Sequence, residues 1–274
     1  MLIRHIRFFI LSHNFNAMLT IISPAKLQNF DKQDRISDFT QPLFLKEAKS
    51  LVKQLRSYST KELAHKLQVN SKIAEENVNR YLKWTTPFTP ENAKQAVFAY
   101  NGEVYRGLDA RSLTNDEIFY LQSHLRMMTG LYGILRPLDL IQPYRLEVKT
   151  KLLTETGKDL YSFWRPKVTK EITKSLKMSD NPDVLLNLAS SEYTKMIDKN
   201  KLKARVIEFD FLQYYPDMET YKPIVIYLKK ARGLMARYVA QNRLTNPDDL
   251  KGFSANGYWY SEKFSSENKM VFVR

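Results

Sequence analysis

The segment Leu125 to Arg145 reads LRMMTGLYGILRPLDLIQPYR, and its pattern decides the fold that we expect around it. Upstream, Thr114 and Glu117 have the spacing of a capping box, and apolar residues then recur at helical spacing as far as Met128. We therefore predict a helix that ends at Gly130, followed by a glycine hairpin. The segment as a whole is interpreted as a helix-hairpin-helix-like element.

The glycines of this hairpin suit an anion, because Gly130 and Gly133 let a ligand approach the backbone amides closely. Tyr132 lies between them and is expected to pack or wedge against a ligand. Positive charge nearby comes from Arg126, Arg136 and Arg145. We predict that these six residues bind phosphate; a plain helix C-cap followed by a turn is the alternative.

Outside this segment, the pattern alternates between helices and short strands. We predict helices over residues 43–55, 159–178 and 230–242, one that follows Ser71 and reaches Trp84, and a short one after residue 190. Ser59 and Glu62 form a capping box that begins a further short helix. We predict strands over residues 19–22, 184–188, 206–211 and 224–228, a hairpin over 97–105, and a terminal strand pair at 258–260 and 270–273. The expected class is α+β, or irregular α/β, with a mixed sheet surrounded by helices.

Four further blocks, together with the 125–145 segment, carry a family resemblance: SPAK at 23–26, AYNGEVYRGL at 99–108, NLASSEY at 187–193 and KKARGLMARY at 229–238. In this ordered set the chain resembles the bacterial peroxide stress protein YaaA family, from Met18 nearly to the C-terminus. The resemblance implies a role in limiting free intracellular iron under hydrogen peroxide. It also implies binding of double-stranded DNA through a helix-hairpin-helix element in a basic cleft.

The extent of the resemblance sets the expected domain organisation. Residues 18–274 are expected to form a single domain of this type. Residues 1–17 precede the resemblance and are interpreted as an extension from an upstream start, either poorly ordered or dispensable. Their apolar core is shorter than a secretion signal requires.

Composition narrows the function classes. Lys and Arg number 43 against 29 Asp and Glu, a net charge of +14, which favours nucleic acid or another phosphorylated ligand. There is no cysteine, so disulfides and thiolate metal sites are excluded, and a reducing cytoplasm is the expected location. Apolar runs are too short to cross a bilayer. We predict no membrane contact, no cofactor and no metal site.

Basic and hydroxyl residues follow three predicted strands, and the ends of parallel strands often line binding sites. The predicted anion-binding residues are Lys26 after the first strand; Ser190 and Lys195 after the strand at 184–188; and Lys229, Lys230, Arg232 and Arg237 after 224–228. If these ends meet, they form an anion-binding cleft. Ordinary N-capping by Ser190 and a solvated basic stripe at 229–237 are the alternatives.

Two functions fit such a cleft. In the first, cleft and hairpin grip the phosphates of double-stranded DNA without reading bases, which gives affinity that tolerates sequence and falls with salt. In the second, the protein is an enzyme that encloses a nucleotide or another small anionic ligand. Glu192 is then the candidate acid or base, and Ser23 with Lys26 a candidate nucleophile pair.

Overall fold

The computed structural model describes residues 18–33, 35–154, 157–177 and 184–274. Its strands are β1 (Leu19–Ile22), β2 (Lys94–Gln95), β3 (Leu125–Thr129), β4 (Gly133–Leu135), β5 (Leu140–Ile141), β6 (Val184–Leu188), β7 (Arg205–Tyr215), β8 (Thr220–Lys222), β9 (Trp259–Tyr260) and β10 (Lys269–Val273). The predicted N-terminal extension, residues 1–17, lies outside the described residues.

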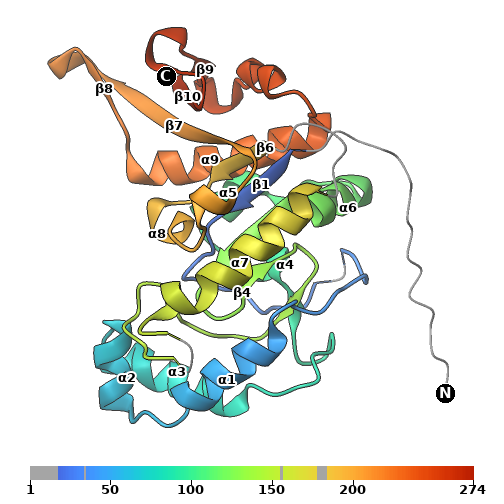
Figure 1. Cartoon of the computed structure of the whole chain (residues 1–274), viewed down its shortest axis with the longest axis vertical. Coiled ribbons are helices and arrows are strands. Elements are labelled where there is room, and N and C mark those ends of the chain that lie inside the picture. Colours follow the sequence, from blue (N-terminus) through green and yellow to red (C-terminus); the bar gives the residue numbers. More distant parts are fainter. Residues whose placement is uncertain (1–17, 34, 155–156, 178–183) are drawn as a thin grey trace.

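The α-helices are α1 (Leu45–Leu55), α2 (Thr60–Leu67), α3 (Ser71–Lys83), α4 (Ala96–Ala99), α5 (Glu103–Leu108), α6 (Asn115–His124), α7 (Leu160–Lys177), α8 (Ser191–Thr194) and α9 (Val225–Asn242). Short 3₁₀ helices are η1 (Ala110–Ser112), η2 (Lys199–Lys201), η3 (Pro216–Met218), η4 (Pro247–Gly252), η5 (Ala255–Gly257) and η6 (Glu262–Phe264). In Figure 1, α1 to α3 lie at one end of the long axis, and the β7–β8 hairpin with the C-terminal elements lies at the other.

Eight strands of the described chain form one mixed sheet in the order β4-β3-β1-β6-β7-β10-β9, with β8 paired to β7. The central strands β3, β1, β6, β7 and β10 are parallel, whereas β4 and β9 pair antiparallel with their neighbours. Helices and 3₁₀ segments connect and cover these strands. The predicted α+β class is confirmed.

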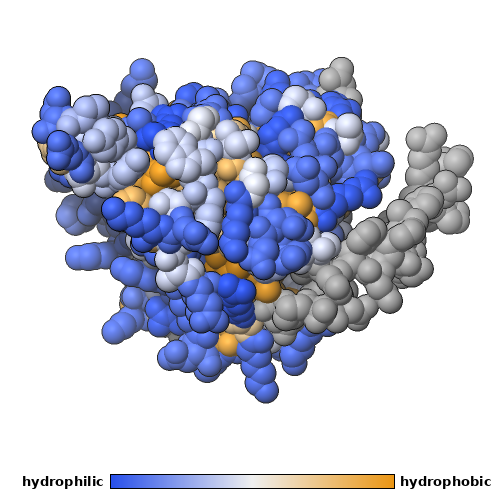
Figure 2. Space-filling view, turned by 90° about the horizontal axis from the view of Figure 1, so that it is seen from above, coloured by the Kyte–Doolittle hydropathy of each residue, from blue (hydrophilic) through white to orange (hydrophobic). Residues whose placement is uncertain are grey.

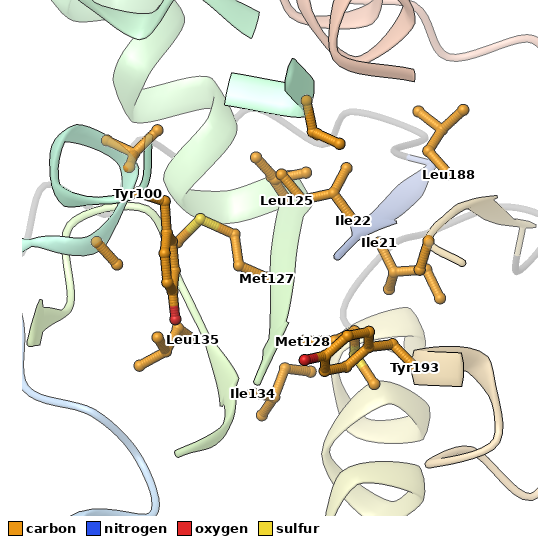
Figure 3. Close-up of a cluster of buried hydrophobic side chains, with 14 of the residues drawn as sticks. Ile21, Ile22, Tyr100, Leu125, Met127, Met128, Ile134, Leu135, Leu188 and Tyr193 are labelled. Atoms are coloured by element: carbon orange, nitrogen blue, oxygen red, sulfur yellow. The ribbon is translucent and has the colours of Figure 1, made fainter. Parts of the chain in front are cut away.

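The register of the central strands fixes where the site can form. Ile22, the last residue of β1, pairs with Met127 of β3 and with Leu188, the last residue of β6. The segments that follow β1 and β6 therefore leave the sheet at the same edge. Both strands are mainly apolar and almost fully buried along their length, as expected for parallel strands covered on both faces. Figure 3 shows their side chains packed with those of β3 and β4.

The glycine segment folds differently from the prediction. The capping box is confirmed, since the Glu117 amide donates to Thr114 Oγ1 at 3.2 Å and the Thr114 amide to Glu117 Oε2 at 2.6 Å. The helix α6 ends at His124, however, and residues 125–135 form the β3–β4 hairpin. The predicted helix up to Gly130 was therefore wrong, and a β-hairpin stands where a helix-hairpin-helix-like element was expected.

Two other predicted elements were wrong. Residues 97–105, predicted as a strand hairpin, belong to α4 and α5 and to the turn between them. Residues 225–228, predicted as part of a strand, form the first turn of α9. The strands at 19–22 and 184–188 and the terminal pair of β9 with β10 are confirmed.

The helices α5 and α9 cross at two glycines. A Cβ atom on Gly107 would lie 2.1 Å from the Lys230 carbonyl oxygen, and one on Gly233 would lie 1.8 Å from the Val104 carbonyl oxygen. The crossing brings backbone against backbone and places α5 beside the end of β1, where the Tyr105 hydroxyl donates to the Ser23 carbonyl at 3.1 Å. This contact links the helix pair to the end of β1.

None of the described helices combines the length and apolarity needed to span a bilayer. Seen from above, the molecule presents mainly hydrophilic residues, interrupted by small apolar patches (Figure 2). Many polar and charged side chains are therefore exposed to solvent on this face.

Candidate functional site

The ends of β1 and β6 are joined by two serines. The Ser190 amide donates to Ser23 Oγ at 2.8 Å, and Ser23 Oγ donates to Ser190 Oγ at 3.2 Å. The Ser190 side chain makes no capping hydrogen bond to α8, so it does not play the N-capping role that the sequence left open. The pair instead fixes the strand ends side by side and positions the chain that continues to Lys26.

Glu147 lies close to three cations at this edge. The sequence did not identify it as a site residue. Its Oε2 lies 3.0 Å from Lys26 Nζ and 3.5 Å from Lys149 Nζ, and its Oε1 lies 3.5 Å from Arg145 Nη2. The Glu147 side chain is only 12% exposed. Two predicted residues, Lys26 and Arg145, are thus brought together from distant parts of the chain.

Glu192 is the second carboxylate of the site. Its Oε2 lies 4.0 Å from Lys149 Nζ, whereas its Oε1 is buried and has no hydrogen-bond partner among the described residues. Burial raises the pKa of this carboxyl, the Lys149 charge opposes that rise, and the Glu147 charge adds to it. Lys26 and Lys195 also favour the charged form, which places both within electrostatic reach of Glu192.

The site as a whole is positively charged. Four cations, Lys26, Arg145, Lys149 and Lys195, face the two carboxylates Glu147 and Glu192. Lys195 is exposed, and its ammonium makes no ion pair with a described residue. A phosphate or carboxylate ligand would therefore find charge that Glu147 and Glu192 do not fully neutralise.

The predicted cations of α9 divide into two kinds. Arg237 donates from Nη1 to the carbonyls of Leu108 and Asp109, at 3.1 and 3.0 Å, and so satisfies the C-terminal end of α5. Arg232 is half-buried, and burial lowers its pKa. Lys229 and Lys230 make no hydrogen bond or ion pair through their side chains with any described residue, so their charge is available. The structure gives no contact between these α9 side chains and the Glu147 cluster.

The residues of the glycine segment pack the interior. The whole turn at 130–133 is buried; the Gly130 carbonyl accepts from Trp164 Nε1 at 2.8 Å, and a Cβ there would lie 2.2 Å from the Leu146 carbonyl oxygen. The Tyr132 hydroxyl is fully buried and accepts from Trp84 Nε1 at 3.1 Å. The phosphate-binding turn predicted at Gly130, Tyr132 and Gly133 is therefore corrected to an interior turn.

Two arginines of the same segment are likewise committed to the fold. Arg126 is buried, and its Nη1 donates to the carbonyls of Gln122, Ser123 and Leu125 at the end of α6. Arg136 Nη2 lies 3.0 Å from Oδ1 of the buried Asp139. Neither guanidinium offers the free charge that the sequence suggested.

No group of three or more His, Cys, Asp or Glu side chains in the described part of the chain could hold a metal ion.

The chain is similar to known proteins over most of its length. Residues 18–264 match the family described as Peroxide stress protein YaaA. A UPF0246 protein of Alteromonas mediterranea is 45% identical over 257 residues, which cover 94% of this chain and 98% of that protein.

Proposed function

The chain belongs to the peroxide stress protein YaaA family, which gives it a role in oxidative stress, and we propose that it fulfils this role by binding double-stranded DNA with little sequence preference. One observation supports this most: Lys26, Arg145, Lys149 and Lys195, from three segments of the chain, converge on one edge of the sheet. The net charge of +14 agrees with a polyanionic partner.

The chemistry of the site favours phosphate contact over base reading. Lysine ammonium groups are mobile point charges, which suit phosphate oxygens and carry no base sequence information. A DNA phosphate would replace Glu147 as the partner of Lys26 and would also meet Lys195. Because binding releases condensed counterions, affinity should depend steeply on salt.

Binding of unrelated duplexes across a salt series tests this proposal. We expect the logarithm of affinity to fall linearly with the logarithm of salt concentration, equally for each sequence. In the double variant Lys26→Gln, Lys195→Gln the slope should be shallower by about 2, since each lost phosphate contact removes about 0.9. The matched control, Lys61→Gln with Lys72→Gln on α2 and α3, removes the same charge from exposed positions away from the site. Binding indifferent to salt would contradict the proposal.

The proposal includes the family's association with limiting free intracellular iron. A cellular measurement tests whether DNA binding is needed for iron limitation. Cells that express the Lys26→Gln, Lys195→Gln variant in place of the wild type are exposed to peroxide. They should contain more free iron, measured by electron paramagnetic resonance. Wild-type iron levels in this variant, despite weakened DNA binding, would separate iron control from DNA contact.

A second function, catalysis on a nucleotide or another small anionic ligand, is favoured by Glu192. A carboxyl with one buried, unpartnered oxygen, a raised pKa and nearby lysines has the properties of a proton donor or acceptor. The serine pair Ser23 and Ser190 lies at the same strand ends. The lysines would then hold the ligand's anionic group and Glu192 would exchange its proton.

The raised pKa of Glu192 predicts a pH effect on stability. The folded state holds this proton above the ordinary value of 4.5, so stability is full below that value and falls as the pH rises through the folded-state pKa. In Glu192→Gln that fall should be smaller. Denaturant unfolding measured between pH 4 and 8 would show it, with exposed Glu75→Gln as the control for overall charge. Parallel pH profiles for Glu192→Gln and the wild type would show that the carboxyl is not perturbed.

A further inference from the structure

A groove of about 780 Å³ runs along α7, the helix that crosses the middle of the molecule in Figure 1. Its charged lining consists of five cations and one carboxylate: Arg165, Lys170, Lys174, Lys177, Lys201 and Asp198. Ser162, Thr169 and Thr173 add hydroxyl groups. The groove was not predicted from the sequence. Its exposed lining is mainly apolar, and the charged ends of long side chains border it.

The helix presents three of these cations on one side. Lys170, Lys174 and Lys177 are spaced i, i+4 and i+7 and therefore share a face of α7. The opposite face, which includes Trp164 and Val168, is buried. The three lysines are exposed, and none makes a hydrogen bond or ion pair with a described residue. Their charge is free, in contrast to that of Lys26, which Glu147 holds at 3.0 Å.

The single carboxylate of the lining is already engaged. Asp198 Oδ2 lies 3.7 Å from Lys201 Nζ, and Asp198 Oδ1 accepts from the Asn200 amide at 3.2 Å. Its charge therefore offsets Lys201 and leaves the cations of α7 uncompensated. A negatively charged ligand in the groove would gain their attraction without first displacing a carboxylate.

The groove lies beside the end of α8, which carries Lys195. Arg165 Nε donates to the Lys195 carbonyl at 3.0 Å, so the first residues of the groove touch the end of α8. From Arg165 to Lys177 the helix rises about 18 Å at about 1.5 Å per residue. Each nucleotide of a strand carries one phosphate, so a groove of this length can contact several of them.

We propose that the α7 groove binds the phosphodiester backbone of one nucleic-acid strand and extends the strand-end site into a continuous track. This inference rests on the DNA binding proposed above and names its principal surface. Lys170, Lys174 and Lys177 contact successive phosphates, and Arg165 joins them to Lys195. The hydroxyls of Ser162 and Thr173 already donate within the protein, to Asp159 and to the Thr169 carbonyl, so the contacts to phosphate come from the cations.

The test is the triple variant Lys170→Gln, Lys174→Gln, Lys177→Gln in the full chain, titrated with a 20-base-pair duplex across a salt series. The slope of log affinity against log salt should be shallower by about 2.7, because three phosphate contacts are lost. Between 50 and 200 mM salt, the wild type should then lose about 40-fold more affinity than the variant. The Lys→Arg triple at the same positions keeps the charge and should bind as the wild type does.

The matched control is Lys46→Gln, Lys49→Gln, Lys53→Gln on α1, which removes the same charge from three exposed lysines with nearly the same helical spacing. If the wild type binds DNA and the α7 triple behaves as this control does, the groove proposal is overturned while DNA binding stands. If the wild type binds no duplex, the proposed function itself fails and the groove proposal fails with it. Thermal unfolding of each triple checks that the fold is intact.

Discussion

Replacement of Gly233 by alanine is expected to destabilise the protein by about 3 kcal/mol or more, at the upper end of the cost of overpacking a core. The added Cβ would lie 1.8 Å from the Val104 carbonyl oxygen and 2.7 Å from the Leu108 amide nitrogen. Both are backbone atoms, so no side-chain rotation relieves the contact. The helices α5 and α9 would have to separate.

Whether Gly233→Ala raises or lowers stability distinguishes helix propensity from the close helix crossing as the dominant effect. Gly233 lies inside α9, where alanine is favoured over glycine by about 1 kcal/mol in an exposed helix. Helix propensity alone therefore predicts a more stable variant, whereas the close crossing predicts a much less stable one. A gain in stability would show that the helices do not approach as closely as the structure has them.

Denaturant unfolding measures this difference, with Gly257→Ala as the comparison. No atom lies within 4 Å of a Cβ on Gly257, but its φ of +76° disfavours alanine, so a loss of about 1–2 kcal/mol is expected there. Gly233→Ala should also weaken DNA binding, because α5 carries Tyr105, whose hydroxyl holds the end of β1 at Ser23.

The elements that could be predicted from sequence are those specified by local signals. The capping boxes at Ser59 and Thr114 set the starts of α2 and α6, and short, mainly apolar runs identify β1 and β6. Each of these signals acts within a few residues, so no knowledge of the fold was needed.

The errors occurred where tertiary packing overrode the local pattern. Leu125 and Met128 continue the helical spacing of α6, but the fully buried strand β3 satisfies the same apolar run by pairing with β1. Val225 and Ile226 are β-branched and indicate a strand, yet they begin α9 and are exposed. A short apolar run is compatible with either structure, and only its neighbours decide.

Part of the candidate site could be predicted, because some of its residues directly follow strands that the sequence identifies. Lys26, Ser190 and Lys195 follow buried strands, and the parallel register brings such ends together. Glu147 and Lys149 lie in a long connection without periodicity, so nothing local indicated their place. The lysines of α7 could have been identified from the sequence, since their i, i+4, i+7 spacing is visible there.

Trp164→Ala is the second change for which we expect a large loss, about 3–5 kcal/mol, because this indole is fully buried and packs against Gly133 and Phe163. Trp164→Phe should cost about 1–3 kcal/mol, since it leaves the Gly130 carbonyl without the indole N–H that now donates at 2.8 Å. Trp259→Ala, at an exposed tryptophan, should change stability by about 0.5 kcal/mol or less.

The two Trp164 variants also decide between an interior turn and a phosphate-binding one at residues 130–133. If the turn is interior, Trp164→Phe lowers stability, while the folded variant keeps the salt slope of DNA binding, because the cations of α7 remain in place. If the turn contacted phosphate, the same variant would disturb the Gly130 backbone and make the slope shallower. Chemical unfolding and a salt titration on one preparation measure both quantities. The burial of Gly130 and Tyr132 leads us to expect the first result.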